Sequence, residues 1–221
     1  MKKTNLAGIV TGLALSTFVS AAFAQQSFRA LMKGSQGKSV EDVRLAPEQQ
    51  VVFVPAEAKN IFGLDQKSDL LLKRTETDNL GEVHYRYIQT YQNIPVENSM
   101  YIVHTKNGML KGMSGSVVLD FDEQMPDVAA ATLTKANAIQ SAINFVAAQK
   151  YAWQDADAEK GLKDHTSDIN ATYYPAAELV WYSPGDAINP RHLHLCYKVD
   201  VYALQPLSRA YYFVDAKKGN V

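Results

Sequence analysis

The segment from Val83 to Thr90 alternates between two sets of side chains, and this pattern restricts the local fold more than any other in the sequence. The odd and even positions hold different residues: Val83, Tyr85, Tyr87 and Gln89 against His84, Arg86, Ile88 and Thr90. Successive side chains of a β-strand point to opposite faces, so a period of two with aromatic and β-branched residues predicts a strand. Asn107-Gly108 predicts a two-residue hairpin turn. We therefore expect an antiparallel β-meander over residues 51–119.

The segments around this strand complete the first half of the chain. Residues 51–54 are apolar and predict a short strand, and residues 56–62 predict a helical turn. Residues 25–44 begin with a polar stretch and predict a flexible N-terminal segment. Residues 120–131 are acidic and predict a linker, so the first domain is expected to cover residues 45–119.

Beyond the linker, the pattern predicts a helix followed by strands. Thr134 is a suitable N-cap, and an apolar helical face follows it at Ala136, Ile139, Ile143 and Val146. Residues 151–171 are polar and predict a loop or a frayed helix. The last segments predict strands over residues 178–182, 193–201 and 210–214, with a turn over residues 215–220. We expect an α+β chain of two small domains, each an antiparallel sheet, the second (residues 132–221) with a helix packed on its sheet.

The sequence ends at Val221, directly after that last turn. A hairpin turn normally delivers a second strand, and here one residue follows it. We therefore expect the second domain to be truncated at its last strand. A natural end that leaves a sheet edge unpaired is the alternative.

Residues 1–24 have the pattern of a secretory signal peptide. Lys2 and Lys3 precede an apolar run, and Ala22-Phe23-Ala24 places small residues directly before the polar Gln25. We expect cleavage after Ala24 and a secreted or periplasmic protein that is not membrane-bound after cleavage. An N-terminal membrane anchor is the alternative, but the apolar run is shorter than the ~20 residues that a spanning helix needs.

The composition excludes several functional classes. The chain has 22 Lys and Arg residues against 23 Asp and Glu residues, so no basic excess favours nucleic acid as a partner. The single cysteine, Cys196, excludes an intramolecular disulfide framework and a multi-cysteine zinc cluster.

The strand and turn from His84 to Val96 resemble a known family. Their sequence, HYRYIQTYQNIPV, is similar to the core of the fungalysin/thermolysin propeptide (FTP) domain, which reads approximately H-x-R-Y-x-Q-x-Y-x-x-I-P-V. The resemblance continues over residues 100–110, where the family has a strand with a histidine and a Lys-Asn-Gly turn. It implies a structural or docking role for the motif positions, which are His84, Arg86, Tyr87, Gln89, Tyr91, Ile94, Pro95 and Val96.

The second half resembles a PepSY domain, which is PepSY/cystatin-like in fold. The similar features are a helix that opens at Leu133-Thr134, a Leu-Cys-Tyr-Lys-Val strand over residues 195–199 and a turn over residues 212–219. FTP followed by PepSY is the architecture of the pro-region of secreted thermolysin-like zinc metallopeptidases. The resemblance implies an intramolecular chaperone and inhibitor of a catalytic domain, in cis or in trans. Zinc is expected only in that domain, which this chain does not contain.

A thermolysin-like zinc site needs His-Glu-x-x-His, which places both imidazoles on one face of a helix. None of the five histidines is followed by Glu, and none has a second His four residues later: His84, His104, His165, His192 and His194. We therefore expect no catalytic residue, no metal ligand and no cofactor in this chain. An enzyme would require a nucleophile, a base and an orienting group brought together in three dimensions.

Several residues have both a functional and a structural interpretation. His192, His194 and Cys196 alternate and would share one face of a strand, where they offer metal ligands, but this spacing spreads them ~6–7 Å apart. We favour a small buried hydrophobic role for Cys196. Arg86 either pairs with a carboxylate in its own domain or with a partner. The tyrosines of the motif favour sheet packing, and residues 94–96 are expected to end a strand and redirect the chain.

A second function is compatible with the same resemblance. FTP and PepSY modules need not be fused to a peptidase. The alternative is therefore a stand-alone exported module that binds and restrains a protease or an envelope partner.

Overall fold

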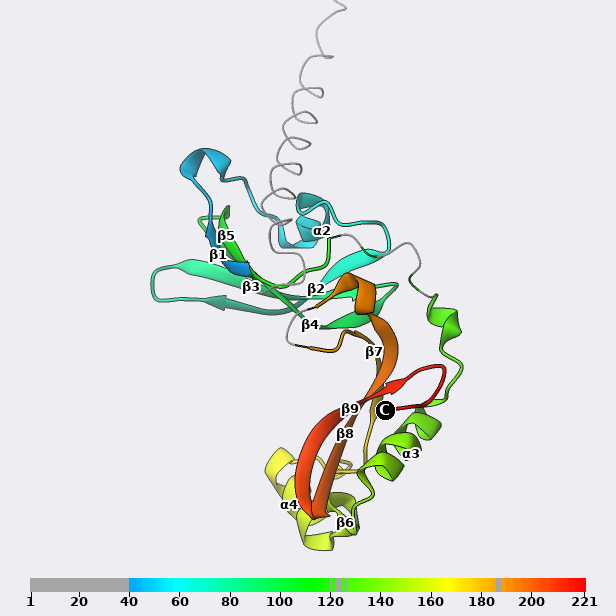
Figure 1. Ribbon diagram of the computed structural model, residues 1–221. Coiled ribbons are helices and arrows are strands. Elements are labelled where there is room, and N and C mark those ends of the chain that lie inside the picture. Colours follow the sequence, from blue (N-terminus) through cyan, green and yellow to red (C-terminus); the bar gives the residue numbers. More distant parts are fainter. Residues whose placement is uncertain (1–39, 120, 122–124, 126, 186–187) are drawn as a thin grey trace, which may run out of the picture. The chain divides into compact units, whose positions relative to one another are not determined.

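The computed structural model describes residues 40–119, 121, 125, 127–185 and 188–221, and it shows an α+β chain with mostly sheet and few helices (Figure 1). The predicted signal peptide, its cleavage site at Ala24 and residues 25–39 of the predicted flexible segment lie outside the described residues. Within the described ranges, no helix combines the length and apolar character needed to cross a membrane. The chain divides into two compact units, and each is described by itself.

Among the described residues, unit 1 contains residues 40–89 and 99–119. Its strands pair in the order β1-β5-β4-β3-β2, and β5 is antiparallel to both of its neighbours. The elements in chain order are β1 (Val40–Arg44), 3-10 helices at Pro47–Gln49 and Pro55–Glu57, α2 (Ala58–Ile61), β2 (Ser68–Thr77), β3 (Glu82–Tyr91), β4 (Ile94–Lys106) and β5 (Met109–Gly115). The last residues of β3 and the first of β4 group with unit 2.

The β-meander and its hairpin turn are confirmed. Asn107 and Gly108 have φ angles of 51° and 74°, the left-handed conformation that a two-residue hairpin turn requires at both positions. Two details of the prediction are wrong. Val40–Arg44 forms β1, paired with β5, although it falls inside the segment predicted to be flexible. Residues 51–54 form only an isolated bridge, from Val52 to Met109, instead of a strand.

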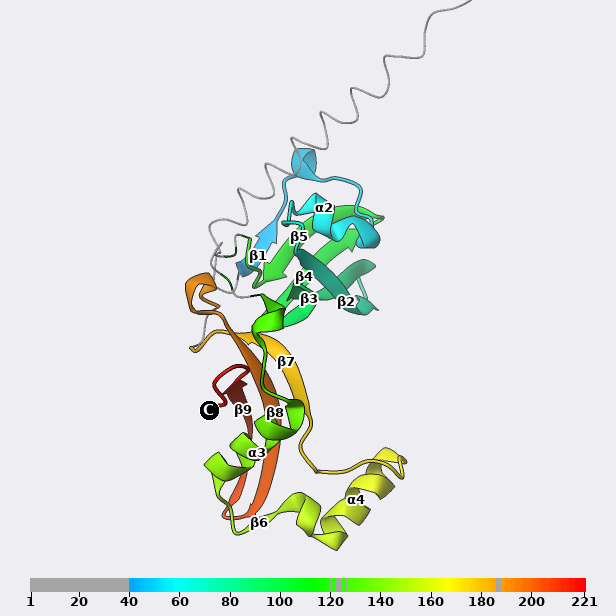
Figure 2. The same ribbon diagram turned by 90° about the vertical axis from the view of Figure 1, so that its right-hand side faces the viewer.

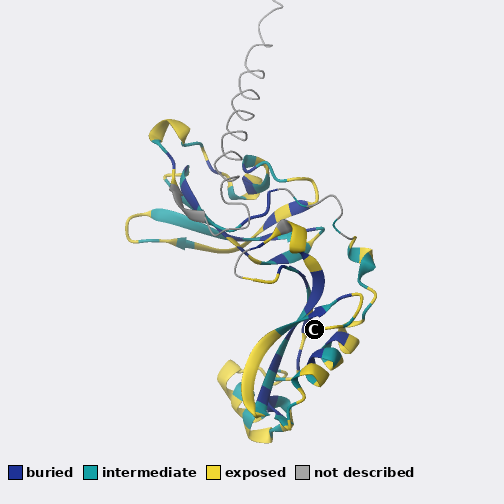
Figure 3. Cartoon of the chain, in the orientation of Figure 1, coloured by how far each residue is buried: buried dark blue, intermediate teal, exposed yellow. Residues whose placement is uncertain are grey.

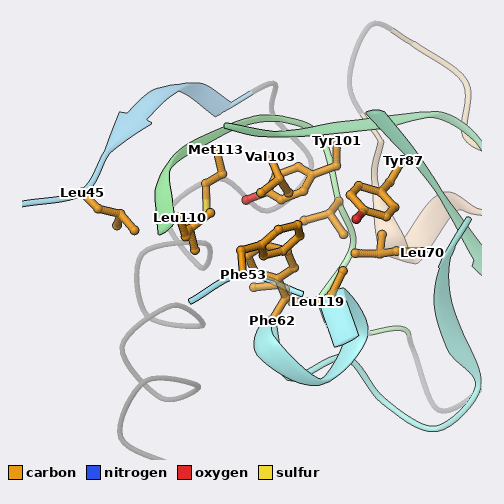
Figure 4. Packing of buried hydrophobic residues seen from close by; sticks show 12 residues of the cluster. Leu45, Phe53, Phe62, Leu70, Tyr87, Tyr101, Val103, Leu110, Met113 and Leu119 are labelled. Carbon is orange, nitrogen blue, oxygen red and sulfur yellow. The ribbon is translucent and has the colours of Figure 1, made fainter. Parts of the chain in front are cut away.

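The core of unit 1 lies between one face of its sheet and the segment that contains α2. Figure 4 shows Phe53 and Phe62 pointing toward side chains of β4. Phe62 meets Tyr101 edge to face at 5.5 Å between ring centroids, and Phe53 lies 5.4 Å from Tyr85. Aromatic pairs at such distances add to the stability that burial of their area provides. One face of the meander is therefore covered by an aromatic layer.

Unit 2 contains Thr90–Asn98 together with the described residues from Phe121 to Val221. Its central strand β8 is antiparallel to β7, β9 and β6. The elements in chain order are a 3-10 helix at Val128–Ala130, α3 (Lys135–Val146), β6 (Lys150–Tyr151), a 3-10 helix at Ala152–Gln154, α4 (Ala156–Thr166), β7 (Ala177–Tyr182), a 3-10 helix at Pro190–His192, β8 (His194–Gln205) and β9 (Leu207–Asp215).

Helix α3 lies along the sheet of unit 2 in both ribbon views (Figures 1 and 2). The predicted cap is confirmed, because Thr134 Oγ1 accepts a hydrogen bond from the Asn137 N–H at 3.2 Å. The predicted apolar face is rotated. Ala138 and Ala142 are fully buried, whereas Ala136 is exposed. Small residues let the helix backbone approach the strands closely, so the alanines and not the larger residues occupy the centre of the contact.

The predicted alternation along β8 is confirmed by its burial. Leu195, Tyr197, Val199 and Val201 are all buried, and Figure 3 shows β8 as largely buried beside a mostly exposed β9. The polar stretch after residue 151 is more ordered than predicted. It contains the 11-residue helix α4, which Asp155 caps by accepting a hydrogen bond from the Ala158 N–H at 2.9 Å.

Candidate functional site

The motif residues of β3 divide between the two faces of the strand. Tyr87, Gln89 and Tyr91 are buried, while His84 and Arg86 are only partly buried. This division follows from the period of two, which places odd and even positions on opposite sides. The motif therefore supplies core residues on one face and titratable groups on the other, and each face is considered in turn.

Gln89 is the central buried polar group of unit 1. Its Nε2 donates to the Val118 carbonyl at 2.7 Å, and its Oε1 accepts from the Val118 N–H at 2.7 Å. The side-chain amide thus supplies Val118 with the donor and the acceptor that a neighbouring strand would otherwise provide. Without them the buried N–H and carbonyl of Val118 would be unpaired, which costs free energy. The Gln89 N–H also donates to Ser99 Oγ at 3.1 Å. This geometry gives Gln89 a structural role.

Tyr87 anchors the segment before α2 to the sheet. Its hydroxyl donates to the Pro55 carbonyl at 3.1 Å. Burial, with a smaller contribution from Tyr85, raises the pKa of Tyr87 to about 12, so the hydroxyl keeps its proton and acts as a donor. Because Tyr87 holds a backbone group and lies within the core cluster, it packs the sheet instead of forming a ligand site.

Tyr91 belongs to unit 2 and has aromatic neighbours there. Its ring stacks on Phe121 at 4.0 Å between centroids and meets Trp181 edge to face at 5.8 Å. The Trp181 Nε1–H also donates to the Tyr91 carbonyl at 2.9 Å. Trp181 is fully buried, so this hydrogen bond satisfies its one polar atom.

The segment Ile94-Pro95-Val96 begins a strand, and the prediction that it ends one is wrong. The chain reverses at Gln92 and Asn93, which have φ angles of 50° and 63°, and β4 starts at Ile94. Val96 is buried and pairs with Trp181 of β7 in parallel register. The turn therefore comes immediately before the motif residues that were expected to make it.

His84 and His104 meet on the other face of the unit 1 sheet. Their Nδ1 atoms lie 2.7 Å apart. The Nε2 of His84 lies 3.4 Å from Asp78 Oδ2, and the Nε2 of His104 lies 3.1 Å from Ser114 Oγ. The hydroxyl and imidazole do not form a Ser-His-Asp triad, because the second ring nitrogen of His104 faces an imidazole instead of a carboxylate.

Arg86 lies on the same face and forms an ion pair inside its own unit. Its Nε is 2.9 Å from Glu76 Oε2, and Arg74 reaches Glu76 Oε1 at 2.7 Å. The hydrogen bond from Arg86 is the main reason why the pKa of Glu76 is lowered. Of the two interpretations of Arg86, the geometry favours the structural one, since the guanidinium already has a carboxylate.

His192, His194 and Cys196 do not share a strand, so the alternation considered for them is wrong. His192 ends a 3-10 helix, and β8 begins at His194. Cys196 is buried, and burial raises the pKa of its thiol to about 12. Among the described residues, no group of three or more His, Cys, Asp or Glu side chains could hold a metal ion. The expected role of Cys196 as a small buried side chain agrees with this environment.

Unit 2 also contains a hollow that the sequence pattern did not predict. It has a volume of about 280 Å³ and lies over the face of β8 that carries Lys198, Asp200 and Tyr202. Arg209 Nη2 bonds to Asp200 Oδ2 at 2.7 Å, and its guanidinium lies 5.3 Å from the ring centroid of Tyr202. Even-numbered polar residues of β8 were the available signal, because the buried odd positions leave them on the opposite face.

Two comparisons with known proteins relate this geometry to a family. Residues 68–117 match the family described as the Fungalysin/Thermolysin Propeptide Motif (FTP). The chain is also 30% identical over 185 residues to proteins called thermolysin from Alicyclobacillus acidocaldarius subsp. acidocaldarius, Bacillus caldolyticus and Bacillus sp. (strain EA1). Each of these matches covers 80% of this chain and 29% of the relative, so the chain spans less than a third of their length.

The matched family segment runs from the first residue of β2 to beyond the end of β5. It includes the Gln89 amide, the His84–His104 pair and the Arg86–Glu76 pair. The chain therefore carries an FTP propeptide motif, and its similarity to the thermolysins is consistent with a propeptide of a thermolysin-like protease.

Proposed function

We propose that this chain is the pro-region of a secreted thermolysin-like zinc metallopeptidase and acts on a catalytic domain as chaperone and inhibitor. The observation that carries the proposal is the FTP motif over residues 68–117, within a match to the thermolysins that covers 80% of the chain. The signal-peptide pattern of residues 1–24 supports export, and the PepSY resemblance of the second half supports the same pro-region architecture.

Both activities follow from one binding equilibrium. A segment that binds the folded protease, and not the unfolded one, stabilises the fold by RT ln(1 + [L]/Kd), which is about 2.7 kcal/mol at 100 times Kd. A covalent tether raises the effective concentration to roughly the millimolar range. The same contact excludes substrate if it covers the cleft. Processing removes the tether, so dissociation or digestion of the pro-region then releases activity.

The chain's own residues would bind and position the partner, and the chemistry of peptide hydrolysis would belong to the catalytic domain. That domain would supply the zinc, which polarises the substrate and activates water. The pro-region is not required to hold this ion for the proposed function.

We place part of the partner contact on the tyrosine-lined hollow of unit 2. Tyr211 is 58% exposed, and Arg209 is held in a fixed direction by Asp200, whose hydrogen bonds raise the pKa of Arg209. Exposed tyrosines and oriented arginines are the residue types that most often dominate binding energy at interfaces. The hollow therefore offers a partner both aromatic area and directed donors.

The direct experiment is addition in trans to the mature enzyme from the same source. The chain should inhibit hydrolysis of a peptide substrate and should raise the yield when the denatured enzyme is refolded. Tyr211→Ala and Arg209→Ala should each weaken inhibition by about 1–2 kcal/mol in binding free energy. Ile169→Ala, which removes an 82% exposed side chain elsewhere in unit 2, is the matched control and should not change it.

Each result decides a different part of the proposal. If the chain at micromolar concentration gives no inhibition and no gain in refolding yield, the pro-region function is contradicted and a stand-alone module is favoured. If Tyr211→Ala and Arg209→Ala inhibit as well as the unmodified chain, the pro-region function stands, but the hollow is not part of the partner contact.

A further inference from the structure

Two imidazoles from neighbouring strands of unit 1 face each other through the same ring atom. The Nδ1 of His84 on β3 and the Nδ1 of His104 on β4 are 2.7 Å apart, and the ring planes are inclined at 76°. A neutral imidazole has one N–H and one lone pair, so at least one of these nitrogens presents a lone pair to the other. The two rings thus aim potential ligand atoms at one point.

The outer nitrogens of both rings have oxygen partners. His84 Nε2 lies 3.4 Å from Asp78 Oδ2, and His104 Nε2 lies 3.1 Å from Ser114 Oγ. Histidines that bind metals use their second nitrogen in this way, which fixes the tautomer and the ring direction. A carboxylate oxygen accepts hydrogen bonds, so Asp78 Oδ2 favours the tautomer of His84 that carries its proton on Nε2. The Nδ1 of His84 is then left with its lone pair.

His104 can expose its own Nδ1 lone pair without losing a proton. If His84 Nδ1 accepts, the His104 Nδ1–H is the donor of the pair, and His104 Nε2 can then accept from the Ser114 hydroxyl. If the proton moves from Nδ1 to Nε2, the Ser114 hydroxyl turns and accepts, because a hydroxyl is both donor and acceptor. Both Nδ1 atoms then carry lone pairs, and the shift itself moves a proton within the His104 ring without removing one.

The distance between the rings is close to that of a shared ligand pair. Two nitrogens at 2.0–2.1 Å from a tetrahedral ion are about 3.3 Å apart, so the rings need to separate by only about 0.6 Å. The His84 side chain is 21% exposed, which leaves a route for an ion. The nearby guanidinium groups of Arg44 and Arg86 are matched by Glu82 and Glu76, which limits their repulsion of a cation.

We propose that His84 and His104 form a two-histidine site for a divalent late transition-metal ion, with Cu²⁺ bound more tightly than Zn²⁺. Imidazole suits both ions, and nitrogen sites generally prefer Cu²⁺. Among the described residues, no third His, Cys, Asp or Glu joins the pair in ligand position. The site goes beyond the proposed pro-region function, and it replaces the expectation that this chain has no metal ligand.

The test uses the full untagged chain, freed of metal with a chelator and titrated with Cu²⁺, Zn²⁺ or Mg²⁺ near neutral pH. Calorimetry should show a Cu²⁺ site and a weaker Zn²⁺ site, and Mg²⁺, which prefers oxygen ligands, should give no heat. In NMR spectra of the unmodified chain, substoichiometric Cu²⁺ should broaden the ring signals of His84 and His104 before those of the other histidines. This readout does not depend on the folding of any variant.

Variants then assign the ligands. His84→Asn and His104→Asn should each abolish the Cu²⁺ site, whereas Asp78→Asn and Ser114→Ala should weaken it about 10-fold because they keep both ligands. The matched control, His192→Asn with His194→Asn, should leave it intact. The proposal is overturned if Cu²⁺ gives no heat, if it first broadens His192 or His194, or if the control loses the site.

Discussion

Units 1 and 2 complete the buried face of the same strand, β3, in chemically different ways. In unit 1, the Gln89 amide makes two 2.7 Å hydrogen bonds to the backbone of Val118. Two residues later, in unit 2, the Tyr91 ring packs against Trp181 and Phe121. The first contact is directional and satisfies polar groups, whereas the second buries aromatic area. Successive positions on one face of a strand therefore stabilise the two units by different interactions, hydrogen bonds at Gln89 and burial of aromatic area at Tyr91.

The polar faces of the two sheets differ as well. In unit 1 the polar side chains pair within the sheet, as Arg86 does with Glu76, and His84 Nε2 lies 3.4 Å from Asp78 Oδ2. In unit 2 the Arg209–Asp200 pair stands beside tyrosine rings around a hollow. The first face therefore pairs its charged side chains with one another, and the second also exposes the Tyr211 ring beside its ion pair. Under the proposed function, the second face contacts the partner.

The largest expected effect is the loss of the aromatic contact in unit 2. Trp181→Ala removes a fully buried ring and leaves a cavity, so we expect a loss of about 3–5 kcal/mol in the free energy of unfolding. Urea unfolding followed by far-UV circular dichroism measures it. Trp181→Phe keeps an aromatic ring but loses the hydrogen bond to the Tyr91 carbonyl. Its free energy of unfolding should lie between those of the unmodified chain and Trp181→Ala. A loss below about 1 kcal/mol for Trp181→Ala would show that this ring does not hold unit 2 together.

The polar contact of unit 1 is tested by a change of similar volume. Gln89→Leu leaves the N–H and the carbonyl of Val118 without their partner, and each buried group costs about 1–3 kcal/mol. We therefore expect a loss of at least about 2 kcal/mol. Gln140→Leu, at an exposed position on α3, is the control and should stay within about 0.5 kcal/mol. If Gln89→Leu were as stable as Gln140→Leu, the hydrogen bonds of the buried amide would not stabilise unit 1, and the contrast with the aromatic contact of unit 2 would fail.

The charge pairs of unit 1 should affect how its free energy of unfolding falls at acidic pH. The pKa of Glu76, lowered mainly by the Arg86 hydrogen bond, is below that of the same group in the unfolded chain. The unfolded state therefore binds this proton first as the pH falls, and stability that is complete above the unfolded pKa is lost from about pH 5 downward. Arg86→Leu should make the loss less steep. Hydrogen exchange of β2 and β3 amides as a function of pH measures it.

A matched variant in unit 2 sharpens the comparison. Lys150 lowers the pKa of Asp155 through a 2.6 Å hydrogen bond, so Lys150→Met should reduce the acid sensitivity of unit 2. An unchanged acid limb of unit 1 in Arg86→Leu would assign its acid sensitivity to other carboxylates.

Elements with strong local signals were predicted correctly. The alternation in β3 and β8, the Asn107-Gly108 turn and the Thr134 cap each depend on residues that are close in sequence. The face of α3 was misplaced because alanine occurs at positions 136, 138 and 142, which makes the apolar arc wide and its centre ambiguous. Only packing against the strands distinguishes Ala138 from Ala136.

Contacts between distant residues were not predictable from periodicity. Strand β1 exists because it pairs with β5, about 70 residues away, and its own sequence has no marked pattern. The sequence pattern offers possible metal ligands within one strand, at His192, His194 and Cys196. The two imidazoles that do meet, His84 and His104, are 20 residues apart and come from neighbouring strands. Register between strands brings them together, and a single sequence gives no direct measure of register.

The smallest effect concerns left-handed backbone at a residue type that rarely adopts it. The Asn107-Gly108 turn of unit 1 has it at Asn and Gly, whereas in unit 2 Ala147 adopts it at the end of α3, with φ 48° and ψ 39°. An L-residue in this conformation costs about 1–2 kcal/mol, and glycine avoids that cost but loses more freedom on folding. Ala147→Gly should therefore stabilise the chain by about 0.5–1 kcal/mol in urea unfolding.

The same substitution at a second alanine of α3 is the control. Ala138→Gly, in the buried middle of the same helix, should destabilise the chain by about 1 kcal/mol or more, because glycine weakens a helix interior. Opposite signs at two alanines of one helix would show that backbone conformation, and not residue type, sets the effect. Destabilisation at both positions would mean that the strain at Ala147 is smaller than the entropy that glycine adds to the unfolded chain.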